Sequence, residues 1–124
     1  MKLYFVTQSE KFGTSMELYP RVPKSIDFEN KEDDKIARIC VCKNPINCIK
    51  AIQPNVFQGC NVNIYSCDIE VNKVYKPTEK QVPDVAATNE LWLVENTTFI
   101  LEEKILFKHG ETIEDLYNKL KNFK

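Results

Sequence analysis

Short apolar segments of strand type recur along the chain, whereas helical spacing of apolar residues is confined to two segments. The strand-type segments are rich in aromatic and β-branched residues. They are 2–7, 36–42, 62–69 with a continuation toward Tyr75, 90–95 and 99–107. The helical segments are 45–53 and 112–122. This pattern predicts an α+β fold with a mixed, mainly antiparallel sheet of five to six strands, one helix after strand two and a C-terminal helix.

Both helical segments carry end signals. Asn44 is a favourable N-cap residue, Pro45 suits the first helical position, and Pro54 ends the segment. In the second segment, Thr112 and Asp115 have the spacing of a capping box. One face of that helix is apolar and carries Ile113, Leu116, Tyr117, Leu120 and Phe123. We interpret this stripe as a packing face rather than a surface that binds a partner.

Two long segments, 8–34 and 76–89, lack any sustained period, and we expect both to be loops. The first contains an acidic run at 27–34, which we interpret as a solvated loop. The segments 90–95 and 99–107 are separated by a short turn and are expected to pair as a hairpin. No internal repeat or low-complexity segment interrupts this order.

The chain has 124 residues, which is the size of one domain, and we treat 1–124 as a single unit. Its formal net charge of −1 argues against a dedicated nucleic-acid binder, because such proteins carry a basic excess. No apolar run approaches the ~20 residues of a membrane span, so no membrane partner is expected. The opening apolar run is too short for a signal peptide, and we expect a cytoplasmic protein.

Arginine is rare, since only two of the 17 basic residues are Arg and the rest are Lys. Abundant Lys, Asn and Ile are typical of an AT-rich genome, such as that of a low-GC bacterium or its phage. In such a composition, Arg21 and Arg38 are candidates for positions where a planar, bidentate donor is needed. The alternative is that they are retained by chance, and Arg38 could equally pair with the acidic residues at 32–34.

The chain has five cysteines, and an odd number cannot all pair in a closed disulfide framework. A chain of this length does not need such a framework. Cys40, Cys42, Cys48 and the single His109 could in principle supply four metal ligands. However, Cys40 and Cys42 alternate with apolar residues in a strand-type segment, which favours small core residues over a metal site. We therefore expect reduced thiols and no metal.

Most catalytic motifs are absent. Three isolated glycines exclude a P-loop and a dinucleotide-binding glycine motif. A single histidine excludes mechanisms that need two, and no nucleophile elbow or metalloprotease helix motif occurs. What remains is the order of a few short segments and the residue types within them.

That order resembles the ADP-ribosyltransferase-like superfamily over residues 1–107. The opening strand Leu3-Tyr4-Phe5-Val6-Thr7 is similar to the family's first strand, and Leu18-Tyr19-Pro20-Arg21 is similar to a loop of its small members. Two later segments, 38–43 with the helix after it and 89–95, resemble an inner strand and the late strand on which the family often carries a catalytic Glu. The resemblance implies a split-sheet cleft that binds NAD.

Carried over by position, Glu90 would be the catalytic carboxylate, and Tyr4, Arg21 and Arg38 would bind the cofactor. Phe5 stands where the family usually has His, and a Phe ring cannot donate to a ribose hydroxyl, so the enzyme question stays open. Glu90 could also be a strand-edge charge facing water, and Tyr4 could be an ordinary core residue. The rival hypothesis is a non-enzymatic inhibitor of a host protein, encoded by a phage or prophage and acting through the two long loops.

Overall fold

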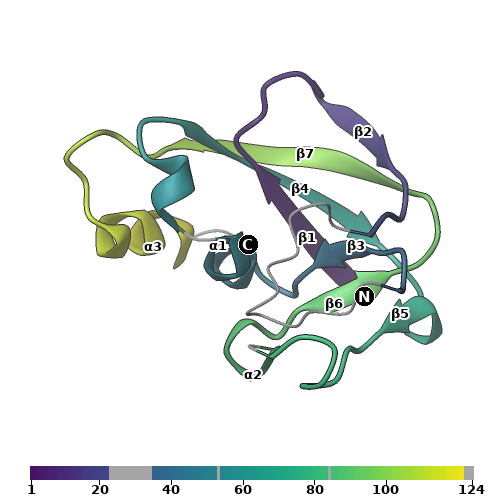
Figure 1. Ribbon diagram of the computed structural model, residues 1–124. Helices are drawn as coiled ribbons and strands as arrows, with labels where there is room; N and C mark the ends of the chain where they lie inside the picture. Colours follow the sequence, from purple (N-terminus) through teal and green to yellow (C-terminus); the bar gives the residue numbers. More distant parts are fainter. Residues whose placement is uncertain (23–34, 53, 84, 122–124) are drawn as a thin grey trace.

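The computed structural model describes residues 1–22, 35–52, 54–83 and 85–121 (Figure 1). The strands are β1 (Lys2–Thr7), β2 (Ser15–Leu18), β3 (Ile39–Val41), β4 (Asn61–Asp68), β5 (Val74–Tyr75), β6 (Leu91–Leu93) and β7 (Thr97–Leu106). The α-helices are α1 (Pro45–Ile52), α2 (Val85–Thr88) and α3 (Ile113–Lys121), and short 3-10 turns span Pro54–Phe57 and Val71–Lys73. The fold is therefore α+β.

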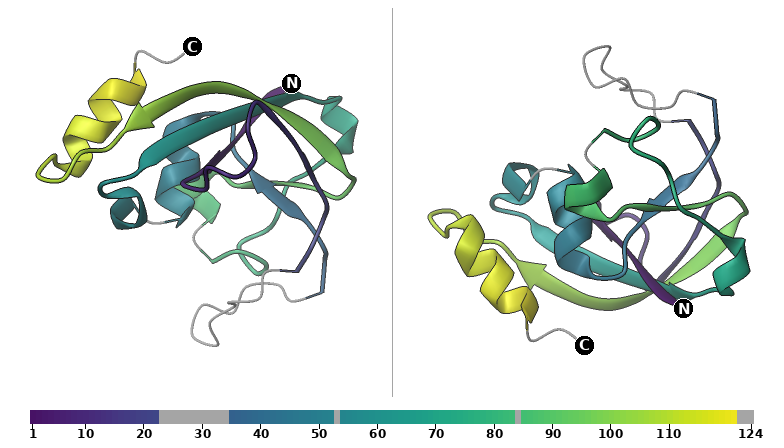
Figure 2. Two further views of the ribbon diagram at one scale, coloured as in Figure 1. Left: turned by 90° about the horizontal axis from the view of Figure 1, so that it is seen from above. Right: turned by 90° about the horizontal axis from the view of Figure 1, so that it is seen from below.

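The strands form two antiparallel sheets rather than one. The larger has the order β1-β4-β7-β2, and the smaller has the order β3-β6-β5. Two isolated antiparallel bridges lie outside the strand pairs of these sheets. They join Tyr4 to Cys42 and Arg21 to Arg38. α3 lies near α1 at one end of the molecule, and the small sheet lies toward the other end (Figures 1 and 2).

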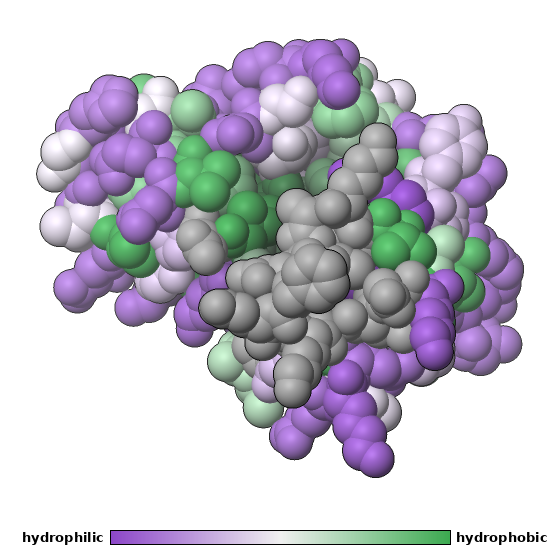
Figure 3. Space-filling view, in the orientation of Figure 1, coloured by the Kyte–Doolittle hydropathy of each residue, from purple (hydrophilic) through white to green (hydrophobic). Residues whose placement is uncertain are grey.

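Alternate residues of the large sheet belong to two different apolar clusters, because successive side chains of a strand point to opposite faces. Tyr4 and Val6 of β1 belong to the cluster that also contains α1 and α3 residues. Leu3 belongs to the other cluster, in which Ile39 and Leu93 of the small sheet take part, and Phe5 packs against it. The periphery of the view in Figure 3 is mostly hydrophilic, with hydrophobic residues gathered near its middle.

Both helices expected from the sequence are confirmed, with their caps. The Asn44 side chain accepts a hydrogen bond from the Asn47 N–H at 2.9 Å. Thr112 and Asp115 form the reciprocal pair of a capping box, at 2.9 and 3.1 Å. Along α3, Leu116 and Leu120 are buried, as a packing face requires. Phe123, the last residue of the expected stripe, lies outside the described residues.

The single mixed sheet and the late hairpin are wrong. β6 pairs with β3 and β5, whereas β7 pairs with β4 and β2. All three residues of β6 are buried, so this strand needs partners on both edges and cover on both faces. The turn is expected at 96–98, but Thr97 and Thr98 begin β7 instead, because β-branched residues suit a strand.

The two expected loops contain regular structure that the sequence pattern did not predict. β2 lies within 8–34, and α2 lies within 76–89. The acidic run at 27–34 lies outside the described residues. The strand expected to run from 62–69 toward Tyr75 is divided into β4 and β5 by the 3-10 turn Val71–Lys73. In the described part of the chain, no helix has the length and apolar character needed to cross a membrane.

Candidate functional site

The two arginines are neighbours in space although 17 positions separate them in the chain. Their backbones exchange two hydrogen bonds, at 3.1 and 3.0 Å, in an antiparallel bridge. Both arginines line one pocket of about 600 Å³, between the end of β2, the start of β3 and the outer part of β1. We call this the arginine pocket, and its other defining residues are Phe5, Thr7, Ser9 and Tyr19.

Arg38 is the buried member of the pair, with 2% of its surface exposed. Its guanidinium carbon lies 4.2 Å from the ring centroid of Trp92, a cation–π contact, and its Nη1 donates to the Ile36 carbonyl at 3.0 Å. The ring of Tyr75 also stacks on Trp92, with centroids 5.4 Å apart and planes 12° from parallel. Arg38 is therefore held in one orientation, whereas Arg21 is exposed.

Most of the charged residues in the described lining of the arginine pocket are basic. Lys11 also lines it, and Glu17 is the acidic residue in its described lining. The carboxylate of Glu17 hydrogen-bonds the Tyr19 hydroxyl and raises the pKa of that phenol, so Tyr19 stays protonated near neutral pH. Within the part of the lining that the structure describes, the excess of basic side chains favours an anionic ligand.

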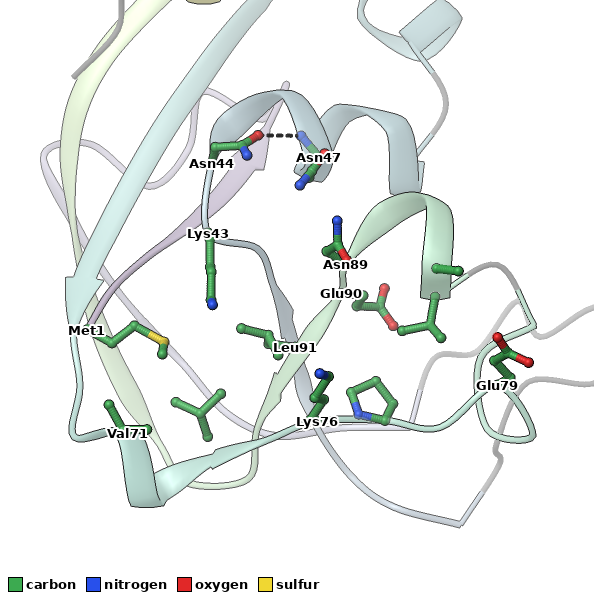
Figure 4. A pocket seen from close by; sticks show the side chains of 14 residues that line it. Met1, Lys43, Asn44, Asn47, Val71, Lys76, Glu79, Asn89, Glu90 and Leu91 are labelled. Atoms are coloured by element: carbon green, nitrogen blue, oxygen red, sulfur yellow. Dashed lines mark hydrogen bonds between the residues drawn. The ribbon is translucent and has the colours of Figure 1, made fainter.

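Glu90 also contacts Trp92, at the indole nitrogen. Its carboxylate Oε2 accepts a hydrogen bond from the indole Nε1 at 2.9 Å, and 9% of the residue is exposed. Glu90 lines a second pocket, of about 660 Å³, which does not contain either arginine (Figure 4). We call this the lysine pocket, after Lys43 and Lys76, and its other defining residues are Asn89, Val71, Val74 and Leu91.

Tyr4 is in neither pocket lining within the described chain. Its side chain is 7% exposed and belongs to the core cluster beneath α1. Its backbone carbonyl accepts hydrogen bonds from the Cys42 N–H at 3.2 Å and from the Cys48 thiol at 3.1 Å. The neighbouring residue Phe5 faces the opposite side of β1 and lines the arginine pocket.

Of the four residues singled out from the sequence, the structure thus brings two together. Arg21 and Arg38 share a pocket, Glu90 lines the other one, and Tyr4 packs in the core. Sequence reasoning missed the pocket roles of Phe5 and Thr7, although the alternation of a strand would put both on one face of 2–7. It also missed Asn89, whose positive φ of 53° is a conformation that Asn tolerates better than most residues.

Two of the five cysteines are poor candidates for a nucleophile. All five are free thiols, and a hydrogen bond with the Cys42 side chain, together with burial, raises the pKa of Cys48 well above its ordinary value. Burial also raises the pKa of the Cys67 thiol to about 11. A thiol with a raised pKa is a poor nucleophile and metal ligand at neutral pH. Among the described residues, no group of three or more His, Cys, Asp or Glu side chains could hold a metal ion.

Comparison with known proteins supplies no relative, since no protein-family model, no curated protein and no solved structure matches this chain.

Proposed function

We propose that this protein binds a phosphate-bearing nucleotide, NAD or a related molecule, in the arginine pocket. The observation that carries the proposal is that Arg21, Arg38 and Phe5 line one pocket. Guanidinium groups bind phosphate oxygens through two parallel hydrogen bonds, which makes a pair of arginines suited to a pyrophosphate. The pocket volume of about 600 Å³ falls within the range of small-molecule sites.

The remaining lining supplies groups for the rest of a nucleotide. The rings of Phe5 and Tyr19 offer faces for a base, and the Thr7 and Ser9 hydroxyls can exchange hydrogen bonds with a ribose. Because Trp92 and Ile36 already fix the orientation of Arg38, little side-chain entropy is lost when a phosphate binds it. Arg21, which is exposed, then closes on the ligand from the rim.

The proposed role is binding without transfer of ADP-ribose. Phe5 occupies the position at which the ADP-ribosyltransferase-like family usually has His, and it cannot donate to a ribose hydroxyl. Glu90, the family-like candidate for the catalytic carboxylate, lines the lysine pocket and is bonded to the Trp92 indole N–H. Glu90 does not line the arginine pocket, and the proposal gives that carboxylate no part in binding the nucleotide.

Thermal unfolding with NAD, ADP-ribose, ADP and adenosine tests the binding proposal. A ligand at a hundredfold its dissociation constant stabilises the native state by about 2.7 kcal/mol. We expect stabilisation by the phosphate-bearing ligands and little by adenosine, and we expect Arg21→Gln to remove most of it. Lys80→Gln is the matched control, because it also removes one positive charge. Lys80 is exposed and lines neither pocket.

Two results would contradict the proposal. The first is the absence of any shift with millimolar NAD, ADP-ribose and ADP. The second concerns the claim that there is no transfer. An NAD-consuming activity that Glu90→Gln abolishes, while the variant keeps the native circular dichroism spectrum, would mean that the protein is an enzyme using Glu90.

A further inference from the structure

The lysine pocket is a second cavity with its own chemistry. Charged groups of both signs line it, and it contains no arginine (Figure 4). It lies between the start of α1, the segment around β5 and the start of β6. Its volume of about 660 Å³ is sufficient for a small-molecule ligand.

Two ammonium groups form its basic part. Lys43 extends from the connection between β3 and α1, and Lys76 extends from the segment after β5, so the two reach the cavity from different sides (Figure 4). Neither lysine forms an ion pair with any residue that the structure describes. Two lysines that reach one cavity complement an anionic group on a ligand.

Two carboxylates, Glu79 and Glu90, line the lysine pocket, and Glu90 is the buried one. Glu90 is 9% exposed, and the Trp92 indole N–H fixes its Oε2 at 2.9 Å. Asn89 lies beside it at the start of β6 and also lines the cavity (Figure 4). A carboxylate held in this way can accept a hydrogen bond from a ligand ammonium, and the Asn89 amide oxygen can accept a second one.

The wall between these charged groups is apolar. Val71, Val74 and Leu91 line it, and Val71 is 66% exposed although it is a large aliphatic residue. An apolar side chain of a ligand would cover this surface and remove it from water.

We propose that the lysine pocket binds a zwitterionic, peptide-like ligand of about dipeptide size with an apolar side chain. Its carboxylate lies between Lys43 and Lys76, its ammonium group contacts Glu90 and Asn89, and its side chain covers Val71 and Leu91. This site is independent of the arginine pocket, because the two pockets share no lining residue.

Isothermal titration calorimetry with the dipeptide leucyl-leucine tests this proposal. N-acetyl-leucyl-leucine lacks the ammonium group and leucyl-leucine amide lacks the carboxylate, so each removes one of the two recognised charges. A hydrogen bond to a charged group contributes about 1.5–3 kcal/mol, so each modified peptide should bind at least about tenfold more weakly. No binding of leucyl-leucine at millimolar concentration, or equal binding of all three peptides, would overturn the proposal.

Variants of the protein separate this site from the proposed nucleotide site. Lys43→Gln should weaken leucyl-leucine at least about tenfold and reduce the preference over the amide, whereas Lys80→Gln should leave both unchanged. ADP binding should persist in Lys43→Gln, and leucyl-leucine binding should persist in Arg21→Gln. If Lys43→Gln binds leucyl-leucine as the native chain does, the assignment is wrong, whatever the outcome with ADP.

Discussion

Trp92, a single residue, connects the two pockets. One face of its ring contacts the Arg38 guanidinium, its indole N–H is bonded to Glu90, and Tyr75 stacks on the ring as well. The side chain is fully buried, so its N–H needs an acceptor within the protein. Glu90 thus has a structural role in addition to lining the lysine pocket.

We expect Glu90→Ala to lower the free energy of unfolding by about 1–3 kcal/mol, because it leaves the buried indole N–H without its acceptor. Glu90→Gln keeps a carbonyl oxygen that can accept the bond and should cost less. Glu95→Ala is the control, because the Glu95 side chain is 63% exposed, and it should change stability by less than about 0.5 kcal/mol. Urea unfolding of the three variants measures these values, and equal stability of Glu90→Ala and the native chain would show that the bond is dispensable.

Individual residues of the candidate site were only partly predictable from the sequence. The scarcity of arginine singled out Arg21 and Arg38, and they do lie together. Their proximity depends on a backbone bridge between segments that no local pattern connects. Glu90 lines the other pocket, and the pocket that each residue lines is decided by tertiary packing.

At the scale of elements, the segments with strong local signals were predictable. α1 and α3 have caps and apolar faces within a few residues of each other, so the chain needs no distant partner to indicate them. The pairing of β6 and β7 was not predictable in this way. A hairpin is the expected connection for two neighbouring strands, yet the complete burial of β6 requires partners from β3 and β5, which are distant in sequence.

The capping box of α3 gives a prediction about pH. Hydrogen bonds from the Thr112 backbone N–H and side chain lower the pKa of Asp115. A group whose pKa is lowered on folding stabilises the native state above its unfolded pKa, and this contribution is lost as the pH falls through the folded value. The stability difference between the native chain and Asp115→Ala should therefore be constant above about pH 5 and shrink in stronger acid.

Denaturant unfolding of both proteins at several pH values measures this difference. As a control, Glu114→Ala changes an exposed carboxylate in the same turn for which no capping bond is found in the described structure. A difference for Asp115→Ala that grows as the pH falls from 5 to 2 would contradict the assignment.

At the scale of the whole molecule, two sheets are held as one unit. The bridges Tyr4–Cys42 and Arg21–Arg38 join them through the backbone, and residues of both sheets share an apolar cluster. We expect a single cooperative unfolding transition, because neither sheet buries its apolar face without the other. Trp92 fluorescence reports on the small sheet and far-ultraviolet circular dichroism on the whole chain, so the two urea curves should coincide. Two separated midpoints would show that the sheets unfold independently.

The most direct test of the proposed nucleotide site uses the two arginines as probes. Because Arg21 and Arg38 are the only arginines in the sequence, arginine-selective ¹⁵N labelling gives two guanidinium Nε–H signals in a proton–nitrogen spectrum. Titration with ADP should shift both signals with one common dissociation constant, and adenosine at the same concentrations should leave them in place. If millimolar ADP moves neither signal, these arginines form no phosphate site and the proposed function is wrong.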